Sequence, residues 1–436
     1  CVTRKLNFKL QEQVSGQSVS SVRDNSVQSV FVIEKMDTLK IVLVALFALT
    51  SYTKADEKVV CYYDSRANSR EVNFDKRYRS RQIRPVLPRT RFDVFAAILF
   101  TDMRASIQTI TKMVPLNEPF DVTRENYRHI TDLKRRFPGL RVLLSVGGGS
   151  DVSGEGSEKN IVYRNLVKQF FVNIKHSIVG ESVIDEKADE HKEQFIALVR
   201  EVRNNFRHDG LLLTLSVLPN VNSSVYYDPR QIAPHVDFVI LHAYDFYTPQ
   251  RNPKEADYPA PLYELIDRKV DENGDFQVRY WLQHGCPNNK LIFGIPTYGR
   301  AWKMDDDSGI TGVPPLTIDG PAEAGPYTNE AGLLSYPEVC TKIATPNEIK
   351  AGYLGKLRKV NDPTRRYGTY AYRLPKDDKE GIWVAFEDPD TAGQKASYVK
   401  AKGLGGVAIV DITLDDFRGL CTGDKYPLLR AAKFRL

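Results

Sequence analysis

Four stretches of the sequence decide the fold: RVLLSVGGGSD at residues 141–151, DFVILHAYDFY at 237–247, KLIFGIPTYGRAW at 290–302 and LGGVAIVDITLDDFRG at 404–419. Each contains a short run that is apolar almost throughout. Such runs are typical of parallel strands buried on both faces of a sheet. Further runs of the same kind lie at 59–63 and 211–217, and a weaker candidate lies at 92–100.

Longer amphipathic segments alternate with these runs. Residues 123–137 and 191–206 each place apolar side chains on one helical stripe, which indicates ordinary packing against a core. Repeated strand–helix units predict an α/β fold with a parallel sheet, closed or open. The rhythm stops after Trp302 and returns at 381–386. The intervening residues 303–380, rich in Gly, Pro, Asp and Tyr, are predicted to form a small inserted α+β module.

The composition is that of a folded protein: 436 residues, of which 42% are hydrophobic and 27% charged. This length allows one large barrel or two to three smaller domains. The net charge of +6 favours at most a weak attraction to acidic glycans or membranes, and no nucleic-acid-binding pattern is present. Residues 147–149 lack the G-x-G-x-x-G spacing of a dinucleotide loop, so no cofactor is expected, and neither is a metal.

The first methionine is Met36, and residues 36–55 have the pattern of a secretory signal peptide. A transmembrane anchor is the alternative, but the apolar run at 41–49 is too short to span a bilayer of about 30 Å. Residues 1–35 are predicted to be untranslated leader or a disordered extension. We therefore expect a secreted, extracellular chain that starts near Asp56 and has no membrane span.

Secretion permits disulfides and glycosylation. Four cysteines remain after the leader, and sequence alone leaves three pairings open: Cys61, Cys286, Cys340 and Cys421. The triplet Asn222-Ser223-Ser224 is a candidate N-glycosylation acceptor.

Several motifs resemble the chitinase-like branch of family-18 glycoside hydrolases, and within it the imaginal disc growth factors of insects. They include VVCYYDS (59–65), HKEQFIALVREV (191–202), LLLTLSVLPNVNSS (211–224) and LDDFRGLCTGDKYPLLRAAKFRL (414–436). The resemblance implies a TIM-type (β/α)8 barrel with an α+β insertion domain between strands 7 and 8. The barrel would comprise residues 56–302 and 381–436, and the insertion residues 303–380.

The resemblance also implies a disulfide between Cys340 and Cys421, which would stabilise the fold by about 4 kcal/mol on the chain-entropy account. In the family the position of Cys61 pairs with a cysteine near strand two, which is absent here. A Cys61–Cys286 pair therefore stays open.

The catalytic run of the family, D-x-x-D-x-D-x-E on strand four, does not occur between residues 149 and 214. Hydrolysis in this family is substrate-assisted: a glutamic acid protonates the glycosidic oxygen while the acetamido group of the substrate attacks. The acidic residues of 181–193 have the wrong spacing and no preceding apolar strand, so we interpret them as a solvated helix start. No catalytic residue is expected.

Sugar-groove positions survive in part. Tyr244 and Asp245 match the M-x-Y-D motif of the family, with its Met replaced by His242, and the Y-G-R motif survives at strand seven. The candidate groove residues are Tyr63, Tyr244, Asp245, Tyr298, Arg300 and Trp302. Aromatic faces stack on sugar rings and Arg donates to hydroxyls, although these tyrosines and Trp302 could equally pack the barrel mouth. The stacking Trp of strand eight is Val410 here, which weakens the case for tight chitin binding.

The segment that should carry strand four is short, since residues 165–180 run almost directly into 181–190. The Arg-rich segment 76–104 also matches the family poorly. We therefore expect a barrel that is incomplete around strand 4, and we hypothesise that the sequence derives from an imperfect or exon-skipped transcript.

Together these observations predict a secreted, catalytically inactive chitinase-like growth factor. It would act through an unknown cell-surface receptor or the extracellular matrix, with residual chitin or oligosaccharide binding. The alternatives are a chitin-binding lectin and, least favoured, an active chitinase.

Overall fold

The computed structural model describes residues 57–64, 94–99, 131–137, 139–145, 188–217, 223–304, 308, 320–351, 355–364, 366–376 and 380–436. The predicted signal peptide, the leader and Asn222 lie outside these ranges. Within them, no helix is both long enough and apolar enough to cross a membrane.

Seven strands form an all-parallel sheet in the order β3-β2-β1-β12-β6-β5-β4. Their bounds are β1 Lys58–Asp64, β2 Val94–Leu99, β3 Arg141–Ser145, β4 Thr214–Val217, β5 Phe238–Leu241, β6 Leu291–Pro296 and β12 Gly406–Val410. All seven lie within or overlap the predicted apolar runs. Such runs are typical of parallel strands covered on both faces. β5, β6 and β12 are buried throughout.

The two end strands of this sheet are β3 and β4. The part of the chain that the structure describes contains no strand between them, which is where strand four of a complete barrel would lie. The prediction of a parallel barrel sheet is confirmed. Within the described ranges, the sheet is open between β3 and β4, where strand 4 was predicted to be missing.

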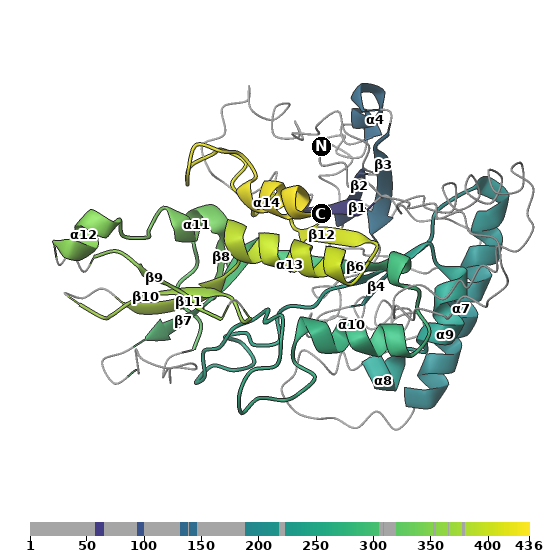
Figure 1. Ribbon diagram of the computed structural model, residues 1–436, viewed down its shortest axis with the longest axis horizontal. Helices are drawn as coiled ribbons and strands as arrows, with labels where there is room; N and C mark the ends of the chain where they lie inside the picture. Colours follow the sequence, from purple (N-terminus) through teal and green to yellow (C-terminus); the bar gives the residue numbers. More distant parts are fainter. Residues whose placement is uncertain are drawn as a thin grey trace, which may run out of the picture. The chain divides into compact units, whose positions relative to one another are not determined.

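Helices follow the strands. The helical elements are α4 Leu133–Arg136, α7 Ala188–Asp209, α8 Ser223–Tyr226, α9 Pro229–Ile232, η4 Ala233–His235, α10 Gly274–Gln283, η5 Asn288–Lys290, α11 Tyr336–Cys340, α12 Pro346–Lys350, α13 Pro389–Ala401 and α14 Pro427–Arg435. On the predicted apolar stripe of 191–206, Val199 is buried and the other members are partly buried: Phe195, Leu198, Val202 and Phe206. Figure 1 shows α13 and α14 side by side, next to β12.

A second sheet is antiparallel and has the order β8-β7-β11-β10-β9. It contains β7 Tyr298–Met304, β8 Leu333–Ser335, β9 Arg358–Asn361, β10 Thr369–Arg373 and β11 Gly381–Phe386. In the sequence it lies between β6 and β12, and Figure 1 shows α11 beside it. β7 and β11 pair with each other in this sheet. β7 runs across the predicted boundary at residue 303, and β11 begins just after the predicted boundary at residue 380.

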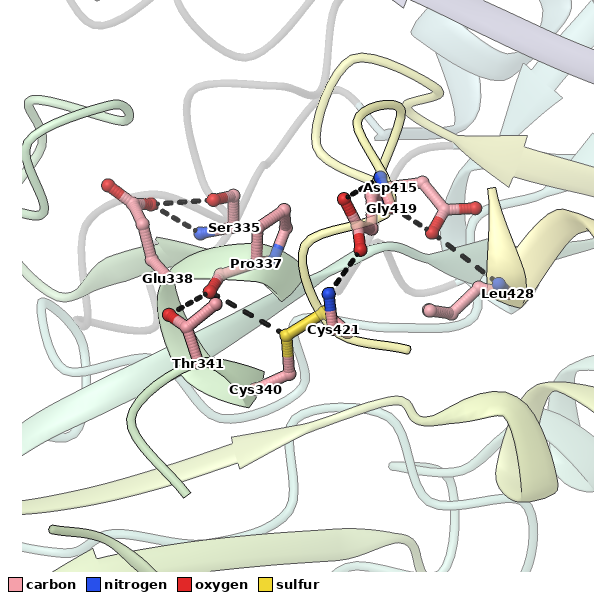
Figure 2. The surroundings of a disulfide bond; sticks show 10 residues. Ser335, Pro337, Glu338, Cys340, Thr341, Asp415, Gly419, Cys421 and Leu428 are labelled. Atoms are coloured by element: carbon pink, nitrogen blue, oxygen red, sulfur yellow. Dashed lines mark hydrogen bonds between the residues drawn. A yellow bond between two sulfur atoms is a disulfide. The ribbon is translucent and has the colours of Figure 1, made fainter. Parts of the chain in front are cut away.

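One disulfide joins α11 to the segment after β12. Cys340 and Cys421 are bonded with their Cα atoms 5.7 Å apart, as the resemblance implied. Figure 2 shows Glu338, two residues before Cys340 in α11, where its carboxylate accepts hydrogen bonds from the backbone N–H and the hydroxyl of Ser335. Cys61 and Cys286 are both buried free thiols, so the Cys61–Cys286 pair does not form in this structure.

Candidate functional site

Asp245 is the charged centre of the predicted groove residues. It follows the end of β5 by four residues and has a positive φ of 54°. Its two carboxylate oxygens accept hydrogen bonds from Arg300 Nε at 2.8 Å and Arg300 Nη2 at 2.6 Å. Burial alone would raise the pKa of Asp245, but the charge and hydrogen bonds of Arg300 and the hydroxyl of Tyr298 hold it below its usual value.

Tyr298 and Arg300 begin β7 and complete this cluster. The Tyr298 hydroxyl donates to Asp245 Oδ2 at 2.9 Å, and the guanidinium of Arg300 lies 5.0 Å from the Tyr298 ring centre. Tyr244 meets Tyr298 edge to face at 6.1 Å. The structure therefore brings together four predicted residues: Tyr244, Asp245, Tyr298 and Arg300.

A network of polar side chains continues from this cluster through Tyr244. His242 Nδ1 is hydrogen-bonded to the Tyr244 hydroxyl, and His242 Nε2 lies 3.2 Å from the Tyr62 hydroxyl. Tyr62 in turn lies 2.7 Å from Ser216 Oγ on β4. Burial lowers the pKa of His242 to about 4, partly opposed by Asp245, so the imidazole is neutral near pH 7. The network thus links β1, β4 and the segment just after β5 through uncharged groups.

Tyr63 is the predicted groove residue of β1, but Tyr62 is the tyrosine of β1 that joins this network. Successive side chains of a strand point to opposite faces. Val60 and Tyr62 belong to the interior cluster that includes Tyr244, whereas Cys61 packs with the other cluster. Tyr63, which is partly buried, alternates with Tyr62 and so lies on the face of Cys61. The period-2 pattern of 59–63 was the signal that could have identified Tyr62.

Trp302 is fully buried in the second sheet. Its indole N–H donates to the carbonyl of Asn252 at 2.8 Å, and its ring meets Trp383 edge to face at 5.6 Å. Both the indole N–H and the aromatic ring of Trp302 are therefore in contact with other parts of the protein. The structure therefore places Trp302 as a core packing residue instead of a groove surface. Val410, at the position of the stacking Trp, is also buried.

The chemistry available to this cluster is limited. A general acid for glycoside cleavage needs a carboxyl group that is protonated near neutral pH. Asp245 has the opposite property, because its pKa is lowered and its charge is neutralised by Arg300. Within the described ranges, no group of three or more His, Cys, Asp or Glu side chains could hold a metal ion.

The parallel sheet carries Tyr, Arg and Asp side chains just after its strand ends, which is where the sites of α/β barrels lie. Residues 58–415 match the family described as Glycosyl hydrolases family 18. The chain belongs to this family, and a TIM-type barrel is the fold that membership implies.

Individual proteins that are similar to this chain belong to the same group. The chain is 45% identical to the chitinase-like protein Idgf4 of Glossina morsitans morsitans over 453 residues, covering 92% of this chain and 100% of the relative. It is 44% identical to imaginal disk growth factor 6 of Drosophila melanogaster, covering 74% and 83%. Among solved structures it is similar to human YKL-39, a pseudo-chitinase with retained chitooligosaccharide binding properties, with a TM-score of 0.63, 25% identity and coverage of 87% and 99%. The predicted resemblance to chitinase-like growth factors is confirmed.

Proposed function

We propose that this protein is a secreted, catalytically inactive chitinase-like growth factor that signals outside the cell. The observation that carries the proposal is the absence of D-x-x-D-x-D-x-E between residues 149 and 214. Without that run, the acid that protonates the glycosidic oxygen is missing. Asp245 does not substitute for it, because Arg300 holds it ionised.

The proposed secretion rests on the signal-like pattern of residues 36–55. The growth-factor role rests on similarity to Idgf4 and imaginal disk growth factor 6. The partner would be a cell-surface receptor or extracellular matrix, and the glycan at Asn222 belongs to the same proposal.

The experiment has two arms on protein purified from insect-cell medium. A fluorogenic chito-oligosaccharide should give no turnover above heat-treated protein, whereas an active family-18 chitinase run alongside should turn it over. Insect cells in low serum should proliferate faster when the protein is added. Turnover that scales with protein concentration would overturn the inactive assignment, and unchanged proliferation would overturn the growth-factor role.

A chitin-binding lectin is a second candidate, favoured by the retained chitooligosaccharide binding of YKL-39. In this chain the sugar would meet the partly exposed Tyr298 and Arg300 at the start of β7. Retention on chitin beads that resists high salt would favour the lectin, because stacking and hydrogen bonds are less screened than surface charge.

A further inference from the structure

The strongest feature outside the groove residues is a run of three basic residues in α4. Lys134, Arg135 and Arg136 are adjacent in the chain, and all three are exposed. The side chain of Arg135 is 82% exposed, and its ion pair with Asp132 at 3.5 Å is of the surface kind that contributes little to stability. Adjacent basic residues are what a serine protease with acidic specificity pockets recognises, because each pocket pairs with a Lys or Arg side chain.

Two other pairs of adjacent basic residues lie wholly in the described ranges, and both are held by the fold. In the pair Arg268-Lys269, the side chain of Arg268 is 15% exposed and donates to the buried carboxylate of Asp257 at 2.6 Å. The pair Arg358-Lys359 lies in β9, whose backbone is paired with β10. Of these three sites, the run in α4 is the one whose basic side chains are all exposed and lie outside a sheet.

α4 is also a turn that opens at little cost. It has four residues, of which Leu133 is buried, and isolated helices shorter than about 12–15 residues are marginal in water. The side chain of Asp132, at its N-cap, makes no capping hydrogen bond. Figure 1 shows α4 next to β3, an end strand of the parallel sheet in the described ranges. Proteolysis follows the population of locally open chain, so α4 is a suitable place for a cut.

We propose that a dibasic-specific serine endoprotease cleaves this protein after Arg136 and converts it into a two-chain form. Hydrolysis breaks the peptide bond between Arg136 and Phe137. It consumes a water molecule and leaves a carboxylate on Arg136 and an amine on Phe137. The proposal rests on the secretion proposed above only for the compartment in which such a protease would meet the chain.

The two chains should stay assembled after the cut. β1 and β2 precede it, whereas β3 and β12 follow it, and the sheet pairs β1 with β12 and β2 with β3. Breaking one peptide bond in α4 removes none of these pairings. The Cys340–Cys421 disulfide lies wholly after the cut and Cys61 is a free thiol, so no disulfide between described cysteines joins the two chains. Denaturant should therefore separate them without a reductant.

A purely structural role of the basic run is the competing explanation. Basic side chains in the last turn of a helix interact favourably with the helix dipole. In a helix of a single turn few peptide dipoles add up, so this benefit is small. A structural role alone predicts that the run is no better a substrate than the pairs in folded elements.

The test uses full-length protein under native conditions and a purified dibasic-specific subtilisin-like protease. Denaturing gels without reductant follow the digestion, and the first new N-terminus should be Phe137. The double variant Arg135→Gln/Arg136→Gln should be cut at least about tenfold more slowly, since the charged partners of the specificity pockets are removed. Arg358→Gln/Lys359→Gln is the matched control, because it gives the same change in net charge and should leave the rate unchanged. Circular dichroism verifies that both variants fold.

A first cut at any other pair of basic residues, such as Lys76-Arg77 or Arg358-Lys359, would overturn the proposal. Equal cleavage rates for Arg135→Gln/Arg136→Gln and the parent chain would also overturn it. Fragments that separate on size-exclusion chromatography without denaturant would overturn the two-chain form. Cleavage is read on gels and by N-terminal sequencing, so its failure is distinguishable from failure of the proliferation assay.

Discussion

Asp245 is a buried carboxylate whose charge is paired within the protein. A buried carboxylate is tolerated only when its charge is paired and its oxygens accept hydrogen bonds. Arg300 supplies both in a two-point contact, and Tyr298 supplies a third hydrogen bond. The cluster therefore holds the start of β7 against the loop after β5.

The substitution Arg300→Ala should destabilise the protein by about 3–5 kcal/mol, because Asp245 stays buried and loses the guanidinium that is hydrogen-bonded to both of its carboxylate oxygens. Urea unfolding followed by tryptophan fluorescence measures the change. Arg430→Ala is the matched control, since the Arg430–Asp424 pair is largely exposed and should contribute little. Equal effects of the two substitutions would show that the buried pair has no special weight.

His242 is the residue by which this chain departs from the M-x-Y-D motif. Its two ring nitrogens are hydrogen-bonded to the hydroxyls of Tyr244 and Tyr62. These hydroxyls are therefore less available for hydrogen bonds to a ligand. The substitution His242→Met removes both hydrogen bonds. We expect chito-oligosaccharide affinity to rise by about tenfold, the equivalent of one additional net hydrogen bond of about 1.4 kcal/mol.

Isothermal titration with a chito-oligosaccharide measures this change. His284→Met is the control, because His284 is exposed and lies after α10, outside the network. A fall in affinity for His242→Met, with the control unchanged, would instead make His242 part of the sugar contact.

At the scale of elements, the last helix depends on an acid that is not one of the groove residues. Asp415 accepts the backbone N–H groups of Leu428 and Leu429 in the first turn of α14 at 3.4 and 3.0 Å. Figure 2 shows the carboxylate of Asp415 beside Leu428. Burial raises the pKa of Asp415 to about 7, although these N–H donors lower it. The helix cap is therefore sensitive to pH.

The raised pKa gives a signed prediction. The folded state retains the Asp415 proton from about pH 4 to about pH 7, where the unfolded chain has lost it, so this contribution to stability is full below pH 4 and is lost as pH rises through 7. Between pH 5 and pH 8 the loss is about 2–3 kcal/mol. Asp415→Asn should remove this part of the pH dependence.

Unfolding free energies at pH 5 and pH 8 measure the effect for the parent chain and the variant. Asp424→Asn is the control, because Asp424 is 64% exposed. If Asp415→Asn and the parent chain have parallel pH profiles, the Asp415 carboxyl does not titrate in this range.

For the whole molecule, the open sheet is the main structural question. β3 and β4 are end strands within the described ranges, and unpaired strand edges favour aggregation. The alignment with Idgf4 of Glossina morsitans morsitans runs over 453 residues but uses 92% of a 436-residue chain. The relative therefore carries residues that have no counterpart here, which agrees with the hypothesis of a skipped segment.

Sequencing the genomic locus tests that hypothesis. We expect coding sequence for an apolar strand, including the acidic residues or their replacements, between the codons for residues 180 and 188. One uninterrupted exon without that strand would overturn it. In that case, size-exclusion chromatography should show self-association that increases with concentration, since the edges would be native.

The sequence alone determined the parallel strands, the family and the absence of the catalytic run, because buried strands and motifs are local patterns of residue type. The Cys340–Cys421 pair needed the resemblance as well. Only the tertiary structure decided that Trp302 is covered by Trp383, that Tyr62 and not Tyr63 meets His242, and that Asp245 is neutralised by Arg300. These facts depend on which strand face and which distant side chain meet, and one-dimensional spacing does not encode those contacts.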